Sequence, residues 1–188
     1  VKNNLQLISG LLYLQSVKHK NAEITAMVDD SQKHINSIAL LHEMLYQDET
    51  LSLVSMKKYL QELGVRLIQV SSKKNIDYKV NIKDISLSTN YATTLGLIFN
   101  ELVTNSIKYA FKEGKKGTIT VTLVEENPNE YQFIYTDNGT GFDVDSKNSE
   151  STMGQKLIRM FAEEIEASLD IRNNNGLTYI LNFKNSIS

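Results

Sequence analysis

The chain has 188 residues, of which 41% are hydrophobic and 22% are charged, and its formal net charge is −2. This is the composition of a globular protein with one or two compact units, and the charge gives no attraction for nucleic acid or an anionic membrane. The absence of cysteine excludes disulfides, cysteine-ligated zinc and thiol catalysis. No apolar run approaches the roughly 20 residues that span a bilayer, so we expect a cytoplasmic chain. Because the chain begins at Val1 and not at methionine, we expect a fragment, with any membrane anchor of the parent lying outside it.

Residues 1 to about 47 predict two helices. They contain no proline and a single glycine, Gly10, and apolar residues recur at steps of three and four. The second half carries a seam of alternating 4-3 spacing, made of Ile24, Val28, Ser31, Ile35, Ile38, His42 and Leu45. A break near residues 19–22 would fold the helices into a hairpin whose apolar surface is too wide for one partner helix. We therefore expect a dimerisation unit at 1–50 that forms a four-helix bundle with a second copy; packing on the rest of its own chain is the alternative.

Residues 51–188 predict a second unit in which helices and strands alternate. In chain order we expect a helix at 56–70 capped by Ser55, a strand around 78–82, a long helix from Ser88 or Thr89 to about Phe111, strands at 118–125 and 131–136, a loop at 137–151, a helix at 153–165, and strands at 168–172 and 178–183. The expected fold class is α+β: the helical hairpin is followed by an α/β sandwich with a mixed sheet backed by helices on one face.

The long helix carries two different faces. Its apolar face consists of Leu95, Ile98, Phe99, Leu102, Val103 and Ile107. At 3.6 residues per turn, the other side carries polar residues at i, i+4, i+7 and i+8, namely Glu101, Asn105, Lys108 and Tyr109. The helix therefore buries one flank and presents a carboxylate, an amide and an ammonium group together. A surface helix whose polar face merely meets water has the same pattern.

Two glycine-containing signals follow the long helix. Asp137 begins an Asp-x-Gly-x-Gly motif directly after a predicted strand, and Gly139 and Gly141 let the backbone turn and approach a ligand closely. The aspartate can accept a hydrogen bond from an amino group. Gly154 stands where the next helix begins, and free backbone amides at such a point favour a phosphate. Each signal alone is more typical of an ordinary loop or turn, but the three signals in this order along the chain are far more specific.

A helical Asn-Glu-x-x-x-Asn, a strand-end Asp-x-Gly-x-Gly and a glycine at a helix start resemble the Bergerat-type ATP-binding fold of the GHKL proteins. Histidine kinases, type II topoisomerases, Hsp90-type chaperones and mismatch-repair ATPases share this fold. Within it, residues 100–111 look like the N-box of sensor histidine kinases. Residues 1–8 and 38–46 resemble the subgroup whose phospho-acceptor segment reads His-Arg-Val-Lys-Asn-Asn-Leu-Gln. The resemblance covers nearly the whole chain.

The resemblance implies a role for each matching residue. It implies that Glu101 is the base or polarising carboxylate beside the γ-phosphate and that Asn105 binds Mg²⁺. It implies that Asp137 binds the adenine amino group, with Gly139 and Gly141 shaping that wall of the site. Lys108 and Tyr109 would lie near the phosphates and the nucleotide, and Gly154 would lie at the phosphate end of the lid at 143–153. One amide oxygen suits Mg²⁺, because the triphosphate supplies other ligands. For Asn100 we expect a structural hydrogen bond, and for Thr178 the role of a plain strand residue.

The chain also departs from the family pattern. In the resembling subgroup the phosphorylated histidine stands two residues before the valine with which this chain starts, so we expect a fragment unable to phosphorylate itself. His42 matches the second-helix histidine of the family and not its acceptor. The segment 152–155 has one glycine where many members have two, and Glu166 and Ala167 stand where a Gly-Gly pair often ends the lid helix. These departures bear on nucleotide affinity and not on the fold.

The expected function is that of the catalytic core of a two-component sensor histidine kinase. Such a core binds Mg-ATP, transfers the γ-phosphoryl group to a histidine and passes it to an aspartate of a response-regulator receiver domain, and it works as a homodimer. The alternative is a non-catalytic nucleotide-binding regulator, or pseudokinase, that acts through dimerisation. ATP-hydrolysing machines of the topoisomerase or chaperone type and serine kinases of the anti-sigma type share the fold. The former carry a transducer domain after the ATP site, and the N-terminal hairpin argues against the latter.

Overall fold

A computed structural model describes Val28, Ser31, Ile35 and the ranges 53–71, 75–111, 116–140, 153–173 and 175–185. The chain separates into two compact units, Val1–Thr50 and Leu51–Ser188, and each is described by itself. In the first unit the three described residues are helical, Val28 is buried, and the other two are half-buried. All three belong to the predicted 4-3 seam. The rest of the predicted hairpin and four-helix bundle lies outside the described residues.

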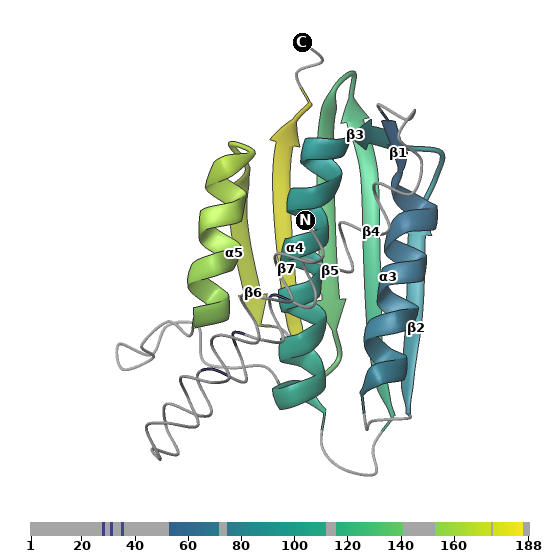
Figure 1. Cartoon of the computed structure of the whole chain (residues 1–188), viewed down its shortest axis with the longest axis vertical. Coiled ribbons are helices and arrows are strands. Elements are labelled where there is room, and N and C mark those ends of the chain that lie inside the picture. The colour runs from purple at the N-terminus through teal and green to yellow at the C-terminus, as the bar shows by residue number, and fades with distance from the viewer. Residues whose placement is uncertain are drawn as a thin grey trace. The chain divides into compact units, whose positions relative to one another are not determined.

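The second unit alternates helices and strands (Figure 1). In chain order its elements are β1 (Leu53–Ser55), α3 (Met56–Val70), β2 (Ile76–Ile82), β3 (Ser86–Ser88), α4 (Thr89–Asn105), η1 (Ser106–Ala110), β4 (Gly117–Asn127), β5 (Glu130–Asp137), α5 (Met153–Glu164), β6 (Ser168–Asn173) and β7 (Leu177–Lys184). The predicted helix at 56–70 is confirmed, and the helix expected at 153–165 ends one residue earlier.

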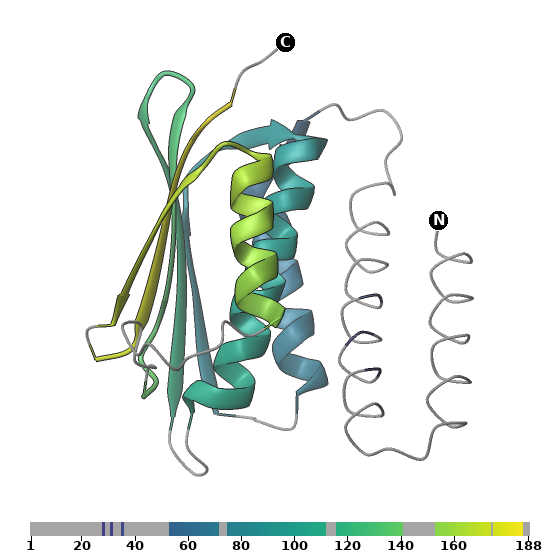
Figure 2. The same cartoon turned by 90° about the vertical axis from the view of Figure 1, so that its left-hand side faces the viewer.

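The described residues form a five-stranded sheet in the order β2-β4-β5-β7-β6. Strands β2 and β4 run parallel, and the other neighbours run antiparallel, so the sheet is mixed as expected. Helices α3, α4 and α5 all lie on one face of this sheet (Figure 2). The predicted fold class, a mixed sheet backed by helices, is therefore confirmed for the second unit.

Alternation along the strands builds the core between the sheet and the helices. On β4, β5 and β7, every second side chain points toward the helices and is buried, including Ile119, Val121, Leu123, Phe133, Tyr135, Tyr179 and Leu181. The predicted apolar face of α4 meets them, since Leu95, Ile98, Phe99, Leu102 and Val103 are at most 1% exposed. Phe99 and Tyr135 are in edge-to-face contact, with ring centroids 6.1 Å apart. The centre of α4 is therefore fixed against the middle of the sheet.

A small sheet of β1 and β3 was not predicted. Leu53 pairs with Ser88, and the Met56 N–H donates to the Ile85 carbonyl at 3.0 Å. Ser55 and Ser88 occupy the expected N-cap positions of α3 and α4, but neither side chain makes a capping hydrogen bond. Backbone pairing between segments some 30 residues apart therefore connects the starts of the two helices. This small sheet was not predicted, because strands of three residues are too short to show an alternation of apolar and polar residues.

The sequence predicted that the long helix continues at 3.6 residues per turn to about Phe111, but the structure shows that it does not. The α-helix ends at Asn105, and Ser106–Ala110 form a π-helical turn, which has the wider i→i+5 hydrogen bonding. Glu101 and Asn105 therefore keep the predicted helical spacing. Lys108 and Tyr109 leave the predicted line, and this part of the prediction was wrong.

Candidate functional site

The last turns of α4 carry a buried carboxylate. Glu101 is only 5% exposed, and its neighbour Asn100 only 2%. The Asn100 Nδ2 donates to Glu101 Oε1 at 3.4 Å, whereas Asn100 Oδ1 has no hydrogen-bond partner in the part of the chain that the structure describes. Glu101 is thus enclosed and not presented to solvent, and the structural hydrogen bond expected of Asn100 goes to this carboxylate.

Gly154, in the first turn of α5, lies against the polar groups of α4. A Cβ at this position would lie 3.1 Å from Glu101 Oε2 and 3.3 Å from Asn105 Nδ2. Any side chain here would therefore press on both groups. The fold brings together a carboxylate, an amide and a bare backbone segment that are some 50 residues apart in sequence.

Asp137, the last residue of β5, is 2% exposed and accepts hydrogen bonds from three donors. The Ser106 Oγ donates to Oδ2 at 2.6 Å, and the N–H groups of Gly139 and Leu177 donate to Oδ1 at 2.9 and 3.4 Å. Ser106 directly follows Asn105. The carboxylate of Asp137 is therefore joined by a single hydrogen bond to the same helical segment that carries Glu101 and Asn105.

Two glycines allow the segments around Asp137 to approach closely. A Cβ on Gly139 would lie 2.7 Å from the Ala110 carbonyl oxygen, and the Thr140 N–H donates to that same oxygen at 3.0 Å. Gly176 has a φ of +127°, and a Cβ there would overlap the Asp137 carbonyl oxygen. The π-turn, the loop after β5 and the start of β7 therefore converge. Gly141 lies outside the described residues.

The π-turn determines where the remaining predicted residues lie. Tyr109 is 72% exposed, and Lys108 is half-buried. Thr178 points away from the helices, and its hydroxyl lies 3.4 Å from that of Thr136 on the neighbouring strand. The structure thus brings Glu101, Asn105 and Gly154 together and joins Asp137 to them through Ser106, whereas Thr178 lies on β7 opposite Thr136.

The groups that hold Asp137 were not predicted from the sequence. Tyr135 donates from its hydroxyl to Ser106 Oγ at 2.8 Å and also lies 3.3 Å from the Leu102 carbonyl oxygen. Burial raises the pKa of Tyr135 well above 10, against a smaller lowering by the hydrogen bond with Ser106, so its phenol stays protonated and can donate. Burial also raises the pKa of Tyr179 to about 12. The available signal was the period of two on β5, which places Tyr135 and Asp137 on one face.

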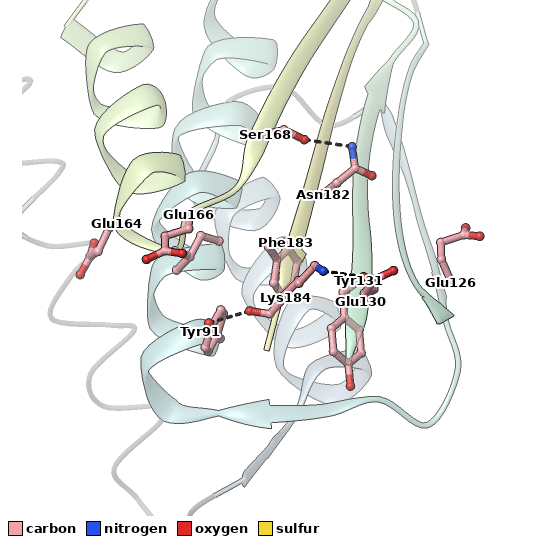
Figure 3. A pocket seen from close by; sticks show the side chains of 11 residues that line it. Tyr91, Glu126, Glu130, Tyr131, Glu164, Glu166, Ser168, Asn182, Phe183 and Lys184 are labelled. Carbon is pink, nitrogen blue, oxygen red and sulfur yellow. Dashed lines mark hydrogen bonds and ion pairs between the residues drawn. The ribbon is translucent and has the colours of Figure 1, made fainter. Parts of the chain in front are cut away.

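A cavity of about 810 Å³ lies elsewhere on this unit (Figure 3). Tyr91, in the first turn of α4, and Glu130, Tyr131 and Lys184 are among the residues that line it. Tyr91 precedes Asn105 by 14 residues, which is roughly 21 Å of helix at 1.5 Å per residue. The cavity is therefore at the other end of α4 from Asn105. It contains the ion pair between Lys184 Nζ and Glu130 Oε1 at 2.8 Å, and none of the predicted site residues lines it.

Two kinds of feature are absent from the described residues. They contain no group of three or more histidines, aspartates and glutamates that could hold a metal ion. A metal ion at Asn105 would thus take most of its ligands from a bound molecule or from water. No helix in the described ranges is long and apolar enough to cross a membrane.

Comparison with protein families identifies the class to which this fold and site belong. The family described as histidine kinase-, DNA gyrase B- and HSP90-like ATPases matches residues 90–186, more than half of the chain. The chain therefore belongs to this ATPase family. A second family, described as histidine kinase, matches residues 1–71. Together the two matches identify the chain as a sensor histidine kinase catalytic core, which confirms the resemblance found in the sequence.

Individual relatives agree with this assignment. The sensor histidine kinase PdtaS of Mycobacterium tuberculosis (strain ATCC 25618 / H37Rv) is 28% identical over 181 residues, covering 92% of this chain and 35% of that protein. This chain thus spans about a third of the length of that relative. The histidine kinase domain of Erythrobacter litoralis EL346 blue-light activated histidine kinase has the same fold, with a TM-score of 0.72, 16% identity and 96% of each chain covered. Full-length ShkA, solved in complex with AMPPNP, gives a TM-score of 0.58 at 14% identity, covering all of this chain and 44% of ShkA.

Proposed function

We propose that the second unit binds Mg-ATP, with the adenine at Asp137 and the phosphates beside the end of α4 and the start of α5. The observation that carries the proposal is that Glu101 and Asn105, at the end of α4, lie close to Gly154. The next residue, Ser106, donates a hydrogen bond to Asp137. The ATPase family of the chain and the AMPPNP bound to ShkA support the same ligand.

The residues fit the chemistry of a nucleotide. Gly154 lets the start of α5 approach Glu101 and Asn105 closely, and at such a helix start backbone N–H groups favour an anion. The Asn105 amide oxygen is a hard ligand suited to Mg²⁺, which when bound would neutralise phosphate charge. Glu101 would polarise the acceptor beside the γ-phosphate. Lys108 would lie near the phosphates, whereas the exposure of Tyr109 limits it to the edge of the site.

The proposed reaction is transfer of the γ-phosphoryl group to a histidine and then to an aspartate of a receiver domain. The histidine would lie upstream of Val1, so this chain alone would bind nucleotide without labelling itself. The histidine kinase family match at residues 1–71 supports a second proposal, homodimerisation through the helical unit at 1–50. Size-exclusion chromatography with light scattering tests the dimer, and a monomeric chain at micromolar concentration would contradict it.

Equilibrium binding of ATP in the presence of Mg²⁺ tests the site. Asn105→Ala should weaken ATP binding by at least about tenfold, because it removes the proposed metal ligand. Asn182→Ala is the matched control, since Asn182 lies exposed on β7, where its amide binds Gln132 and Ser168. Binding that is absent in the unsubstituted chain, or equal in both variants, would refute the assignment of the nucleotide to this site.

Phosphotransfer is tested with γ-labelled ATP on this chain and on a version extended upstream. Acid-labile and alkali-stable label on the longer chain alone is the expected result. ATP binding without label on either chain would favour the alternative, a nucleotide-binding regulator that does not transfer phosphate. Label on this chain would contradict the upstream acceptor and point to a histidine within residues 1–50.

A further inference from the structure

A chain of hydroxyl groups leads to the carboxylate of Asp137. Tyr135 donates to Ser106 Oγ at 2.8 Å, and Ser106 donates to Asp137 Oδ2 at 2.6 Å. Tyr135, Ser106 and Asp137 are 1%, 3% and 2% exposed. Water therefore has little access to these groups, and each hydroxyl proton is directed by its neighbour.

The hydrogen bonds also determine which lone pairs of Asp137 remain available. Each carboxylate oxygen accepts about two hydrogen bonds. Oδ1 receives the N–H groups of Gly139 and Leu177, whereas Oδ2 receives, among the described residues, only Ser106 Oγ. The remaining acceptor position of the side chain is thus on Oδ2, the oxygen that Ser106 holds.

We propose that Ser106 and Tyr135 are positioning residues that orient the free acceptor of Asp137 and thereby make the site selective for purines that carry a 6-amino group. This inference rests on the proposed binding of adenine at Asp137. A 6-amino group donates to the oriented oxygen, whereas a 6-oxo group would place an acceptor against it. Without the Ser106 hydroxyl, Oδ2 loses the one hydrogen bond that the described residues give it, and the carboxylate is oriented only by the two N–H groups at Oδ1.

The structure separates this role from a contribution to folding. Removal of the Ser106 hydroxyl leaves Tyr135 with a second acceptor, the Leu102 carbonyl oxygen at 3.3 Å. Asp137 retains both backbone donors at Oδ1. Ser106→Ala should therefore leave the chain folded but measurably less stable, because the buried Oδ2 loses a hydrogen bond. A loss of stability that is common to all ligands does not change the ratio of affinities between two nucleotides, so this ratio isolates the positioning role.

The test is a thermodynamic cycle in which a side chain of the protein and the 6-substituent of the nucleotide are both varied. The affinities are measured on the whole chain with Mg²⁺. Binding constants are measured for ATP, for GTP and for purine riboside triphosphate, which lacks the 6-amino group. The proteins are the unsubstituted chain, Ser106→Ala and Tyr135→Phe. Thr93→Ala is the control, because Thr93 is a half-buried α4 residue whose hydroxyl donates only to the Thr89 carbonyl at 2.7 Å, near the start of the helix.

We expect the unsubstituted chain and Thr93→Ala to bind ATP about tenfold more tightly than purine riboside triphosphate, as one buried charge-assisted hydrogen bond implies. In Ser106→Ala this preference should shrink to about two- or threefold, and the rejection of GTP should weaken with it; Tyr135→Phe should show a smaller change of the same sign. An equal loss for all three nucleotides, or an unchanged ratio, would overturn the positioning role while leaving ATP binding at the site intact. Failure of the unsubstituted chain to bind ATP would instead overturn the proposed function.

Discussion

Helix α5 ends on a left-handed residue that is not glycine. Glu166 has a φ of 51°, and its N–H donates to the Glu163 carbonyl at 3.0 Å, while the Ala167 N–H donates to the Ala162 carbonyl at 2.8 Å. These are the two hydrogen bonds of a Schellman ending, in which glycine is usual. A residue with a Cβ costs about 1–2 kcal/mol in this conformation, whereas glycine loses roughly 0.5–1 kcal/mol more backbone entropy on folding. We therefore expect Glu166→Gly to raise the free energy of unfolding by about 0.5–1 kcal/mol.

Urea and thermal unfolding followed by circular dichroism measure this change, since the chain has no tryptophan. The unfolding temperature should rise by about 1–4 °C. Asn129→Gly is the matched control: Asn129 has a φ of 63° in the turn between β4 and β5, but asparagine tolerates this conformation, so its gain should be near zero. Glu164→Gly, at the last residue of α5, where φ is not positive, should lower the free energy of unfolding by up to about 1 kcal/mol. A Glu166→Gly chain that is no more stable than Asn129→Gly would refute the reasoning.

Three further predictions test the site and its surroundings. Gly154→Ala should cost less than about 1 kcal/mol of stability, because the crowded atoms of Glu101 and Asn105 are side-chain ends, but it should weaken ATP binding at least about tenfold; unchanged affinity in a titration would contradict the site. Burial holds the folded-state pKa of Tyr179 at about 12, above the ordinary 10. The contribution of the protonated Tyr179 to the free energy of unfolding is therefore complete below pH 10 and is lost as the pH rises to 12. This loss is roughly 2–3 kcal/mol, so the free energy of unfolding of Tyr179→Phe, plotted against pH, should fall less steeply between pH 10 and 12 than that of the unsubstituted chain; the same slope in both proteins would contradict the prediction. Asn100→Leu removes a buried amide whose Oδ1 is unpaired among the described residues, so the thermal unfolding temperature should stay the same or rise. Phosphotransfer by the chain extended upstream should fall, because Glu101 loses a hydrogen-bond donor. Full phosphotransfer activity would show that Asn100 does not position Glu101.

The local patterns of the sequence predicted the main elements well, because those elements are specified by residues near one another. The helix at 56–70 follows from an apolar stripe with a helical period, and its bounds match α3. The strands near 131–136 and 178–183 follow from alternation, since the described helices of the second unit all cover the same face of the sheet. The same reasoning identified the buried face of α4.

Elements that depend on partners far away in sequence could not be predicted in this way. Strands β1 and β3 have three residues each and are defined by pairing with one another. The convergence of Gly154 with Glu101 depends on how α5 packs beside α4, which no local period specifies. Motif residues were thus found from the sequence, but their mutual distances required the fold.

The π-turn shows why the supporting residues of the site were harder to find than the motif residues. A regular continuation of α4 would have kept Lys108 and Tyr109 in line with Asn105, and local propensity gave no reason to expect otherwise. The turn begins at Ser106, whose hydroxyl is bound to Asp137 on β5, and the Tyr135 hydroxyl of that strand also reaches the Leu102 carbonyl one turn earlier. The departure from the regular helix therefore coincides with hydrogen bonds from the sheet. Since π-turns often mark functional sites, this irregularity at the end of α4 agrees with the nucleotide site that we propose there.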